Sequence, residues 1–394
     1  MSKQSPPITR TLNLVAFAVF GGVLFMRVTD PVIPKIALGL GVATATAALL
    51  SSAFTLAYAL PEPLIGALAD MFSKTRLMLL SLLVLAIATI AGGLAPNIQM
   101  LFGSRIVGGL ASGGVVPAAF AFVGDAVPVE ERQVAMGRVL FAIMSANLLS
   151  EAGAGVVGDL LGWRGVFFAA GIVGLLAFAA AAPGLWRLPA TTGRVDWRRF
   201  GPNYRTIFKN PLAKICFGAV FLEGCFMYGV FPYIATMLHQ SGVTLSSIAG
   251  IVIAGFGVGG ALYGLTISKV LPWLGEQRMM RLGGGIMGLC LLIIAANVPW
   301  PVELLGFALL GFGFYMLHGV IQVYASELAP DARGSAMALH TFFYFIGQSL
   351  GPVIYGLGLN TVGIRPLLVV GAAVLVGTGL VCAQWLRRDM PAAV

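Results

Sequence analysis

Long apolar stretches follow one another along almost the whole chain, and short breaks rich in proline, glycine or charged residues separate them. An α-helix needs about 20 apolar residues to cross the hydrocarbon core of a bilayer, and most stretches reach that length. Proline, glycine and charge clusters mark where such helices end. The pattern predicts twelve membrane-spanning helices, at residues 11–33, 44–69, 75–95, 100–126, 133–158, 164–187, 211–238, 245–270, 276–298, 302–327, 333–359 and 364–387.

The composition places this chain in lipid. Of its 394 residues, 58% are hydrophobic and 10% are charged, whereas a soluble domain has about 25% charged residues. We therefore expect an all-α membrane protein whose main surroundings are the lipid bilayer. The four cysteines show neither metal-ligand spacing nor a neighbouring histidine pair, and no metal or cofactor is expected.

The distribution of Lys and Arg predicts the orientation. The net charge is +9, but the bases form no continuous patch, so no nucleic-acid partner is expected. When the breaks are assigned alternately to two sides, the bases gather on one side, which the positive-inside rule makes cytoplasmic. Both termini are then cytoplasmic in a multi-pass protein of the cell membrane, expected to be a bacterial inner membrane. The exceptions are Arg27, Lys35, Arg105, Arg164 and Arg365.

One polar interval interrupts the apolar pattern near the middle of the chain. It is rich in bases and holds Trp197 and Phe200, which are typical anchors of a short helix at a membrane surface. The interval predicts a basic cytoplasmic linker at 188–210, between an N-terminal six-helix bundle at 1–187 and a C-terminal six-helix bundle at 211–394.

A weak internal repeat supports this division. At an offset of 201 residues, the segment 131–136 aligns with 332–337, and the same offset pairs Gly155 with Gly356. Both copies open the fifth helix of their half. Such a match is typical of parallel repeats related by an axis along the membrane normal, and it predicts two pseudo-symmetric bundles.

Several short motifs resemble those of the major facilitator superfamily. One lies in the loop between helices 2 and 3, a second in helix 4, a third in the glycine-rich helix 5, and a fourth before helix 11. The motif residues are Gly66, Asp70, Lys74 and Arg76 after helix 2; Arg105, Gly109 and Gly113 in helix 4; Gly153, Gly155 and Gly158 in helix 5; and 330–334 before helix 11.

The fifth-helix glycines and the Asp30-Pro31 pair look most like the drug:proton antiporter branch and its sugar-efflux-like relatives. Glu151 stands late in that helix, nearer the outer surface, where an apolar or small residue is common. The resemblance implies a secondary active transporter that exports small amphipathic or apolar molecules in exchange for protons, by rocking of two halves about a midplane site. A small-molecule substrate and protons are then its partners, and a monomer is the expected form.

Two other functions remain open. One is uptake of a nutrient or an organic anion by symport or uniport, and an anion would want unpaired arginine in the cavity, for which only Arg27 and Arg105 are available. The other, of a different class, is a non-transporting membrane receptor, although no extramembranous signalling domain is apparent. An enzyme is not expected, because the chain has no HExxH metal motif and no Ser or Cys nucleophile with a suitably spaced histidine. Direct use of ATP is not expected, because no GxxxxGK phosphate loop appears.

The resemblance also implies a latch at the cytoplasmic ends of the helices. Asp70 is expected to face the N-terminus of helix 11, where the helix dipole favours a carboxylate by about 0.3–1 kcal/mol. The residues expected beside it close the cytoplasmic side, with a weaker counterpart in the second half. The predicted latch consists of Gly66, Asp70, Lys74, Arg76, Asp125, Arg132 and Arg333.

Ionisable residues inside the spans are candidates for proton coupling, since a charge at the bilayer centre costs about 2.5–3.5 kcal/mol or more. Arg27 and Asp30 are one helical turn apart and can pair, while Arg105 can compete for the same carboxylate. We expect Asp30 to pair with Arg105, because the family's helix-4 arginine faces helix 1. Such a pair is either a static structural contact or a proton-linked one.

Two further acids are the leading proton- or cation-binding candidates. Glu62 lies between two prolines in helix 2, and Glu223 lies near the middle of helix 7, followed by Tyr228. The alternative for each acid is a neutral, hydrogen-bonded structural role. His318 in helix 10 and His340 in helix 11 are candidates for proton relay or ligand binding, against the alternative of an ordinary interhelical hydrogen bond.

Overall fold

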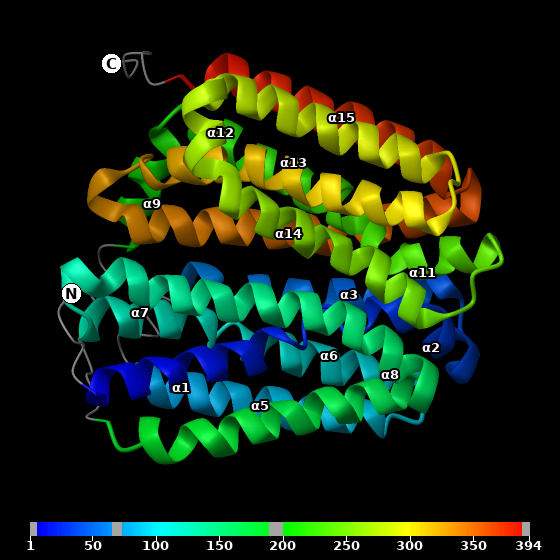
Figure 1. Ribbon diagram of the computed structural model, residues 1–394, viewed down its shortest axis with the longest axis horizontal. Coiled ribbons are helices and arrows are strands. Elements are labelled where there is room, and N and C mark those ends of the chain that lie inside the picture. The colour runs from blue at the N-terminus through cyan, green and yellow to red at the C-terminus, as the bar shows by residue number, and fades with distance from the viewer. Residues whose placement is uncertain (1–5, 65–72, 189–199, 388–394) are drawn as a thin grey trace.

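The computed structural model is helical, with no strand, in the residues it describes, which are 6–64, 73–188 and 200–387 (Figure 1). The first helices are α1 (Pro6–Val23), η1 (Asp30–Val32), α2 (Ile33–Leu40), α3 (Thr44–Ala59), α5 (Lys74–Gly93), α6 (Ile98–Ser112), α7 (Val116–Ala126) and α8 (Val129–Leu185). The later helices are α9 (Phe200–Lys209), α10 (Ala213–Phe226), η3 (Tyr228–Val230), α11 (Phe231–Gln240), α12 (Ser246–Ala295), α13 (Trp300–Ser326), η4 (Pro330–Ala332), α14 (Arg333–Thr361) and α15 (Ile364–Trp385).

Nine helices in the described residues are long and apolar enough to cross a membrane, and Ile8–Val23 is a shorter apolar helix. Two of the nine, α8 and α12, turn back on themselves at a glycine, as the reversal of α8 in Figure 1 shows. Gly162 has φ 69° and Gly275 has φ 72°, a left-handed conformation that glycine adopts without steric cost. These reversals lie at the predicted breaks between 158 and 164 and between 270 and 276.

Three predicted helices are interrupted where the apolar pattern suggested continuity. The chain leaves the helical path after Val23, between α6 and α7, and between α10 and α11. A proline stands in the first turn of the helix that follows each interruption: Pro31 in η1, Pro117 in α7 and Pro232 in α11. Proline is favoured in the first turn of a helix, where its missing amide hydrogen would have no partner, so each proline fits the start of the new helix.

The helices form two groups that lie side by side (Figure 1). The N-terminal group, α1 to α8, packs α8 against α1 and α5, and α6 against α3 and α5. The C-terminal group, α10 to α15, packs α12 against α13 and α15, and α10 against α14. Two helix pairs join the groups most extensively, α3 with α14 and α8 with α12.

Helix α9 lies within the predicted linker, at the end of the molecule where α1 begins and α15 ends (Figure 1), called the α9 end below. It packs on α10 and α14, with Ile207 buried. Its Tyr204 hydroxyl donates a hydrogen bond to the carbonyl of Pro63 in the N-terminal group. Partial burial raises the pKa of Tyr204, so the hydroxyl remains a neutral donor. The helix therefore contacts both groups.

The backbones of α8 and α12 touch at glycines. A Cβ added to Gly250 would lie 2.3 Å from the carbonyl oxygen of Glu151, and one added to Gly155 would lie 2.4 Å from the carbonyl oxygen of Ser246. Small residues at a crossing let helices approach closely, and the resulting van der Waals packing is one source of helix association in lipid. The two groups therefore meet through backbone contact at this crossing.

Replacing Gly250 by valine should lower the thermal stability of the purified protein, because overpacking a tight contact costs about 1–3 kcal/mol. The matched control is Gly264→Val in the same helix, where nothing lies within 4 Å of an added Cβ. Thermal unfolding in detergent would be compared for both variants. Equal melting temperatures for the two would contradict the close α8–α12 crossing.

Candidate functional site

A cavity of about 340 Å³ lies between the two groups of helices. Its volume falls within the range of about 300–1,000 Å³ that holds small-molecule ligands. The cavity wall includes α8 from Leu140 to Glu151 and α13 from Phe314 to Gln322. The start of α8 and the end of α13 both lie at the α9 end, so the cavity extends in that direction. The polar and aromatic residues of the wall are Arg27, Tyr58, Asn147, Glu151, Tyr228, Phe256, Phe314, Tyr315, His318, Gln322, Tyr344, Phe345 and Gln348.

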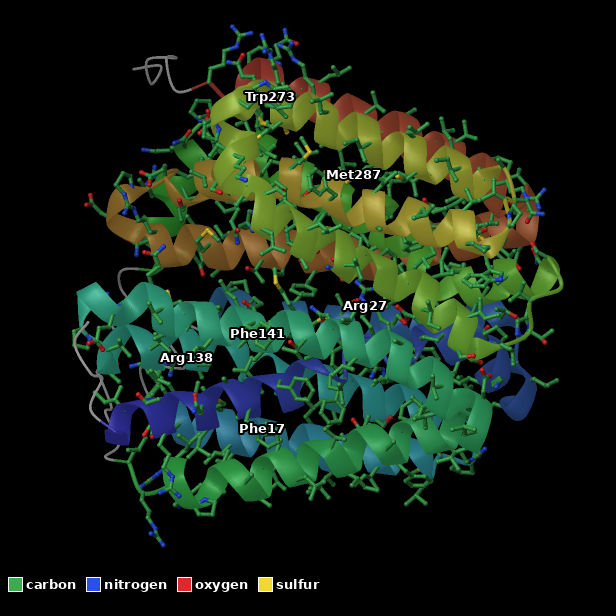
Figure 2. The ribbon with its side chains drawn as sticks, viewed as in Figure 1. Phe17, Arg27, Arg138, Phe141, Trp273 and Met287 are labelled. Atoms are coloured by element: carbon green, nitrogen blue, oxygen red, sulfur yellow. The ribbon has the colours of Figure 1, made fainter. Side chains whose placement is uncertain are left out.

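Arg27 lies between the two groups in Figure 2 and contacts both. Its guanidinium lies 3.3 Å from Oδ2 of Asp30 and donates a 2.5 Å hydrogen bond to Oε1 of Gln348 in α14. It also stacks over the ring of Tyr228, 4.3 Å from the ring centroid. Asp30 is fully buried and accepts a second hydrogen bond from Ser51 at 2.5 Å. Besides each other, Arg27 therefore has Gln348 and Asp30 has Ser51 as a hydrogen-bond partner.

The expected ion pair between Asp30 and Arg105 is wrong. Arg105 does face the end of helix 1, but it donates hydrogen bonds to the carbonyls of Phe25 at 3.0 Å and Met26 at 3.1 Å. Because α1 ends at Val23 instead of continuing to residue 33, these carbonyls have no partner within a helix and accept from the guanidinium fork. Arg27, one turn from Asp30, forms the ion pair with its carboxylate instead.

Glu223 and His318, both predicted candidates, form one pair. Oε2 of Glu223 lies 2.8 Å from Nδ1 of His318, and Glu223 has no exposed surface. The ring of His340 lies 5.0 Å from that of His318. In the described part of the chain, Oε1 of Glu223 and Nε2 of His340 have no hydrogen-bond partner. His318 lines the cavity, whereas Glu223 and His340 lie behind it.

Glu62 is buried in the turn that follows α3. Tyr58, one turn earlier, hydrogen-bonds its side chain and lines the cavity. The ring of Tyr58 packs on Phe345 of α14, with centroids 4.4 Å apart. Glu62 therefore touches the cavity only through Tyr58.

The three predicted acids share one arrangement, because each lies one side chain behind the cavity wall. Asp30 lies behind Arg27, Glu223 behind His318, and Glu62 behind Tyr58. The acid that reaches the wall directly is Glu151, which is not among the predicted coupling residues. Asn147 and Glu151 are four residues apart and therefore lie on one face of α8. Two polar residues on one face of an apolar helix were the available sign that this face lines a cavity.

A second contact missed from the sequence joins the groups at the end opposite α9. The carboxylate of Asp159 accepts hydrogen bonds from the backbone amides of Ser246 at 2.9 Å and Ser247 at 2.8 Å, at the N-terminus of α12. Lys35 of α2 lies 2.7 Å from the same carboxylate. Unpaired amides and the helix dipole make a helix N-terminus favourable for an anion. Asp159 thus caps a helix of the other group.

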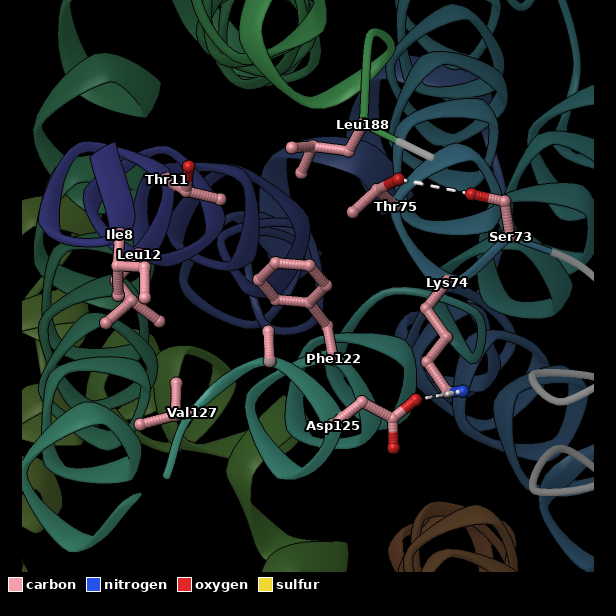
Figure 3. Close-up of a pocket in the computed structure, with 11 residues that line it drawn as sticks. Ile8, Thr11, Leu12, Ser73, Lys74, Thr75, Phe122, Asp125, Val127 and Leu188 are labelled. Carbon is pink, nitrogen blue, oxygen red and sulfur yellow. Dashed lines mark hydrogen bonds and ion pairs between the residues drawn. The ribbon is translucent and has the colours of Figure 1, made fainter. Parts of the chain in front are cut away.

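Two members of the predicted latch meet at the α9 end, as Figure 3 shows: Nζ of Lys74 lies 2.7 Å from Oδ2 of Asp125. They line a pocket of about 330 Å³ together with residues from the start of α1, the end of α7 and Leu188. Gly66 and Asp70 lie outside the described residues, so the contact expected between Asp70 and helix 11 stays a prediction.

The other predicted latch residues lie apart from this pair. Arg76 stacks over the ring of Trp186, 5.8 Å from its centroid. Arg132 donates to the carbonyl of Val127 at 3.4 Å. Arg333 pairs with Glu327 of its own group at 3.1 Å, in an exposed position. The structure therefore assembles the Lys74–Asp125 part of the predicted latch.

A family model described as Major Facilitator Superfamily matches residues 15–352 of this chain and, in a second match, residues 216–394. The chain belongs to the Major Facilitator Superfamily. The resemblance drawn from the motifs is confirmed, and the protein is a multi-pass membrane protein of a transporter family.

Known relatives of this Major Facilitator chain include two named for drug resistance. Multidrug resistance protein 2 of Bacillus subtilis is 23% identical over 404 residues, which cover 99% of this chain and 99% of that protein. Quinolone resistance protein NorA of Staphylococcus aureus is 26% identical over 365 residues, 89% of this chain and 90% of that protein.

Solved structures share its fold. The nucleoside transporter NupG superposes with a TM-score of 0.80 at 15% identity, over 96% of this chain and 100% of that one. A bacterial homologue of the human lysosomal transporter Spinster, inward-facing and unoccupied, gives a TM-score of 0.70 at 18% identity, over 97% of this chain and 96% of that one.

A double-mutant cycle tests which arginine holds Asp30 in this Major Facilitator protein. Asp30→Asn combined with Arg27→Gln should show a coupling free energy of about 1–3 kcal/mol, because the two side chains are in contact. The same cycle with Arg105→Gln should give a smaller coupling, because those two side chains form no ion pair and their charges act on each other only across space. Thermal and denaturant unfolding in detergent would measure both. A larger coupling with Arg105 would restore the pairing expected from the sequence.

Proposed function

We propose that this chain is a secondary active transporter that exports small amphipathic or apolar molecules in exchange for protons, by alternating access. One observation carries the proposal: a ligand-sized cavity between two groups of helices has buried acids placed one side chain behind its wall. Charged groups at membrane depth are costly and mark ion or substrate pathways. The resistance named in Multidrug resistance protein 2 and in NorA agrees with export.

The architecture we infer is twelve spanning helices in two pseudo-symmetric six-helix bundles. Dividing α8 at Gly162 and α12 at Gly275, and adding the shorter helix Ile8–Val23, brings the nine candidate spans to twelve. The bundles then comprise 1–187 and 211–394, joined by the linker 188–210. From the Lys and Arg distribution we infer that both termini are cytoplasmic. We expect a monomer in a bacterial inner membrane. The common end of α1, α9 and α15 in Figure 1 supports this orientation.

The cavity wall suits amphipathic molecules. Aromatic rings of Tyr228, Phe256, Phe314, Tyr315 and Tyr344 form one side of it, and several pack edge to face on one another. Apolar pockets with a few polar groups are typical of small-molecule sites. Bound molecules would leave toward the outer side once the contacts at that end open.

Proton coupling is assigned to the pairs Glu223–His318 and Asp30–Arg27. His318 lies between the cavity and Glu223, so a proton from the cavity can reach the acid through the imidazole. Protonation of Asp30 would weaken its hold on Arg27, whose other side-chain hydrogen bond is to Gln348 of the opposite group. The charge state of these acids is thereby linked to contacts between the groups.

The arginines do not favour uptake of organic anions. Arg27 is engaged by Asp30 and Gln348, and Arg105 by two backbone carbonyls. An anion site would need a cation left available at the wall. Export of neutral or positively charged amphipathic molecules fits this wall better.

Transport in proteoliposomes tests the proposal. Glu223→Gln should abolish flux driven by a pH gradient, with loss of about tenfold or more, because the proton-carrying acid is removed. The matched control is Glu303→Gln, which removes another buried acid that does not line the cavity. Normal thermal stability of both variants would show that they fold. Full pH-driven transport by the Gln or Asn variants of Asp30, Glu62 and Glu223 alike would refute proton coupling through them.

At the end of the molecule opposite α9, the contact between Asp159 and the start of α12 should close the cavity on the outer side. Asp159→Asn keeps the shape but loses the charge-assisted hydrogen bonds, which are about twice as strong as neutral ones. A cysteine replacing buried Ser246 should then react several times faster with a membrane-impermeant maleimide. Glu327→Gln, which breaks an exposed ion pair at the α9 end, should leave the rate unchanged. Equal labelling rates with and without Asp159→Asn would contradict this role.

A further inference from the structure

A second hollow, a groove of about 250 Å³, lies within the N-terminal group of helices. Phe20, Leu24 and Val28 form one wall, and the two arms of α8, before and after the reversal at Gly162, form the rest. Figure 1 shows α1 between these two arms. The groove shares no lining residue with the central cavity, so it is a separate site.

The groove lies at membrane depth, toward the end opposite α9. Its residues Val157 and Leu149 stand five and thirteen residues before the reversal at Gly162. At a rise of about 1.5 Å per residue, they lie about 7 and 20 Å from that turn. One leaflet contributes about 15 Å of hydrocarbon to the bilayer core. The groove therefore lies among the acyl chains of the leaflet at this end.

The wall offers no free group to a polar occupant. Among the described residues that line the groove, Ser150 alone has a polar side chain. Its hydroxyl already donates a 2.7 Å hydrogen bond to the carbonyl of Leu24. A polar group buried here would lose its hydrogen bonds without replacement. The volume is also below the range of about 300–1,000 Å³ that is typical of small-molecule pockets, so a slender alkyl chain fits better than a drug-sized molecule.

The groove opens onto the lipid-facing surface. Leu149, which lines it, is 52% exposed. Phe17, Val156 and Ile172, which stand close to the lining residues on the same helices, are exposed apolar residues as well. Lipid tails are as apolar as these side chains and are the solvent at this depth. Because an unfilled groove would deprive its walls of dispersion contacts, a lipid tail is the occupant that this surface supplies.

The groove and the central cavity lie on opposite sides of the unwound end of helix 1, residues 24–29, between α1 and η1. Leu24 and Val28 line the groove, whereas Met26 and Arg27 line the cavity. A chain seated in the groove therefore packs directly behind the segment that carries Arg27.

We propose that this groove binds one acyl chain of a membrane phospholipid, which packs behind the unwound end of helix 1. The site goes beyond the proposed function, because it requires neither export nor proton coupling. Loss of pH-driven transport would leave the inference intact, and loss of the lipid site would leave proton coupling intact.

Native mass spectrometry of the full chain tests the proposal. Protein from nanodiscs of palmitoyl-oleoyl phosphatidylglycerol would be released into detergent, and the retained phospholipids counted. Wild-type protein should keep one phospholipid under conditions that strip the surrounding lipids. Gly153→Leu should lower its occupancy by about tenfold or more, because the new side chain displaces methylenes from the groove. A Cβ added to Gly153 has nothing within 4 Å, so leucine can enter the groove without a backbone clash.

The matched control is Gly137→Leu in the same helix. An added Cβ there also has nothing within 4 Å, but Gly137 does not line the groove, so occupancy should equal that of wild type. Ala169→Leu narrows the groove from the second arm of α8 and should act as Gly153→Leu does.

Photolabelling locates the chain in unaltered protein. A phosphatidylglycerol with a diazirine in the middle of its acyl chain should label residues 149–157 and 166–173 several times more than the exposed face of α5, formed by Leu80, Val84 and Ile87. Equal labelling of these surfaces would show ordinary surrounding lipid only and overturn the proposal. Lipid retention unchanged in folded Gly153→Leu and Ala169→Leu would also overturn it. So would a dimer that Gly153→Leu dissociates, because a second copy of the chain would then fill the groove.

Discussion

Hydrocarbon offers no hydrogen-bonding partners, and this constraint determines where the polar groups of the protein lie. The break after Val23 shows its effect most clearly. Unwinding the end of helix 1 frees the carbonyls of Phe25 and Met26, which Arg105 then satisfies. The same unwound segment places Arg27 between Asp30 and Gln348. An irregular backbone at membrane depth is tolerated where protein groups complete it, and here two arginines do so.

Much of the fold was predictable from the sequence, because spanning helices need long apolar runs and the runs are separated by clear breaks. The predicted helices that prove to be interrupted each have a proline at the start of the next helix, Pro31, Pro117 or Pro232, although Pro352 lies inside the unbroken α14. A criterion based only on the length of apolar runs passes over such prolines. Their physical effect, the loss of a backbone donor, was the available signal. The two reversals at Gly162 and Gly275 fell at predicted breaks.

The sequence indicated which residues belong to the candidate site but not which of them are in contact. Charged residues within apolar runs are conspicuous, which is why Asp30, Glu223 and His318 were selected. Their partners follow from packing: Glu223 meets a histidine 95 residues away, and Arg27 meets a glutamine 321 residues away. Glu151 was noticed late in helix 5 but was not selected as a coupling residue, and only the packing of the two groups shows that it lines the cavity. Asp159 was not selected from the sequence, and only the position of α12 gives it a role.

The pairing of charges explains how two groups of helices could move apart in lipid. The ion pairs Arg27–Asp30, Lys35–Asp159 and Lys74–Asp125 each lie within the first group, and Arg333–Glu327 lies within the second. The hydrogen-bonded pair His318–Glu223 also lies within one group.

Contacts across the interface use neutral partners instead. Arg27 meets the amide of Gln348 and the ring of Tyr228, and Asp159 meets the amides that open α12. Separating a buried ion pair would leave two uncompensated charges, at a cost of about 3–5 kcal/mol. Separating these groups leaves each charge with its counter-ion. The interface can therefore open with a smaller electrostatic penalty, which is the property that alternating access requires of it.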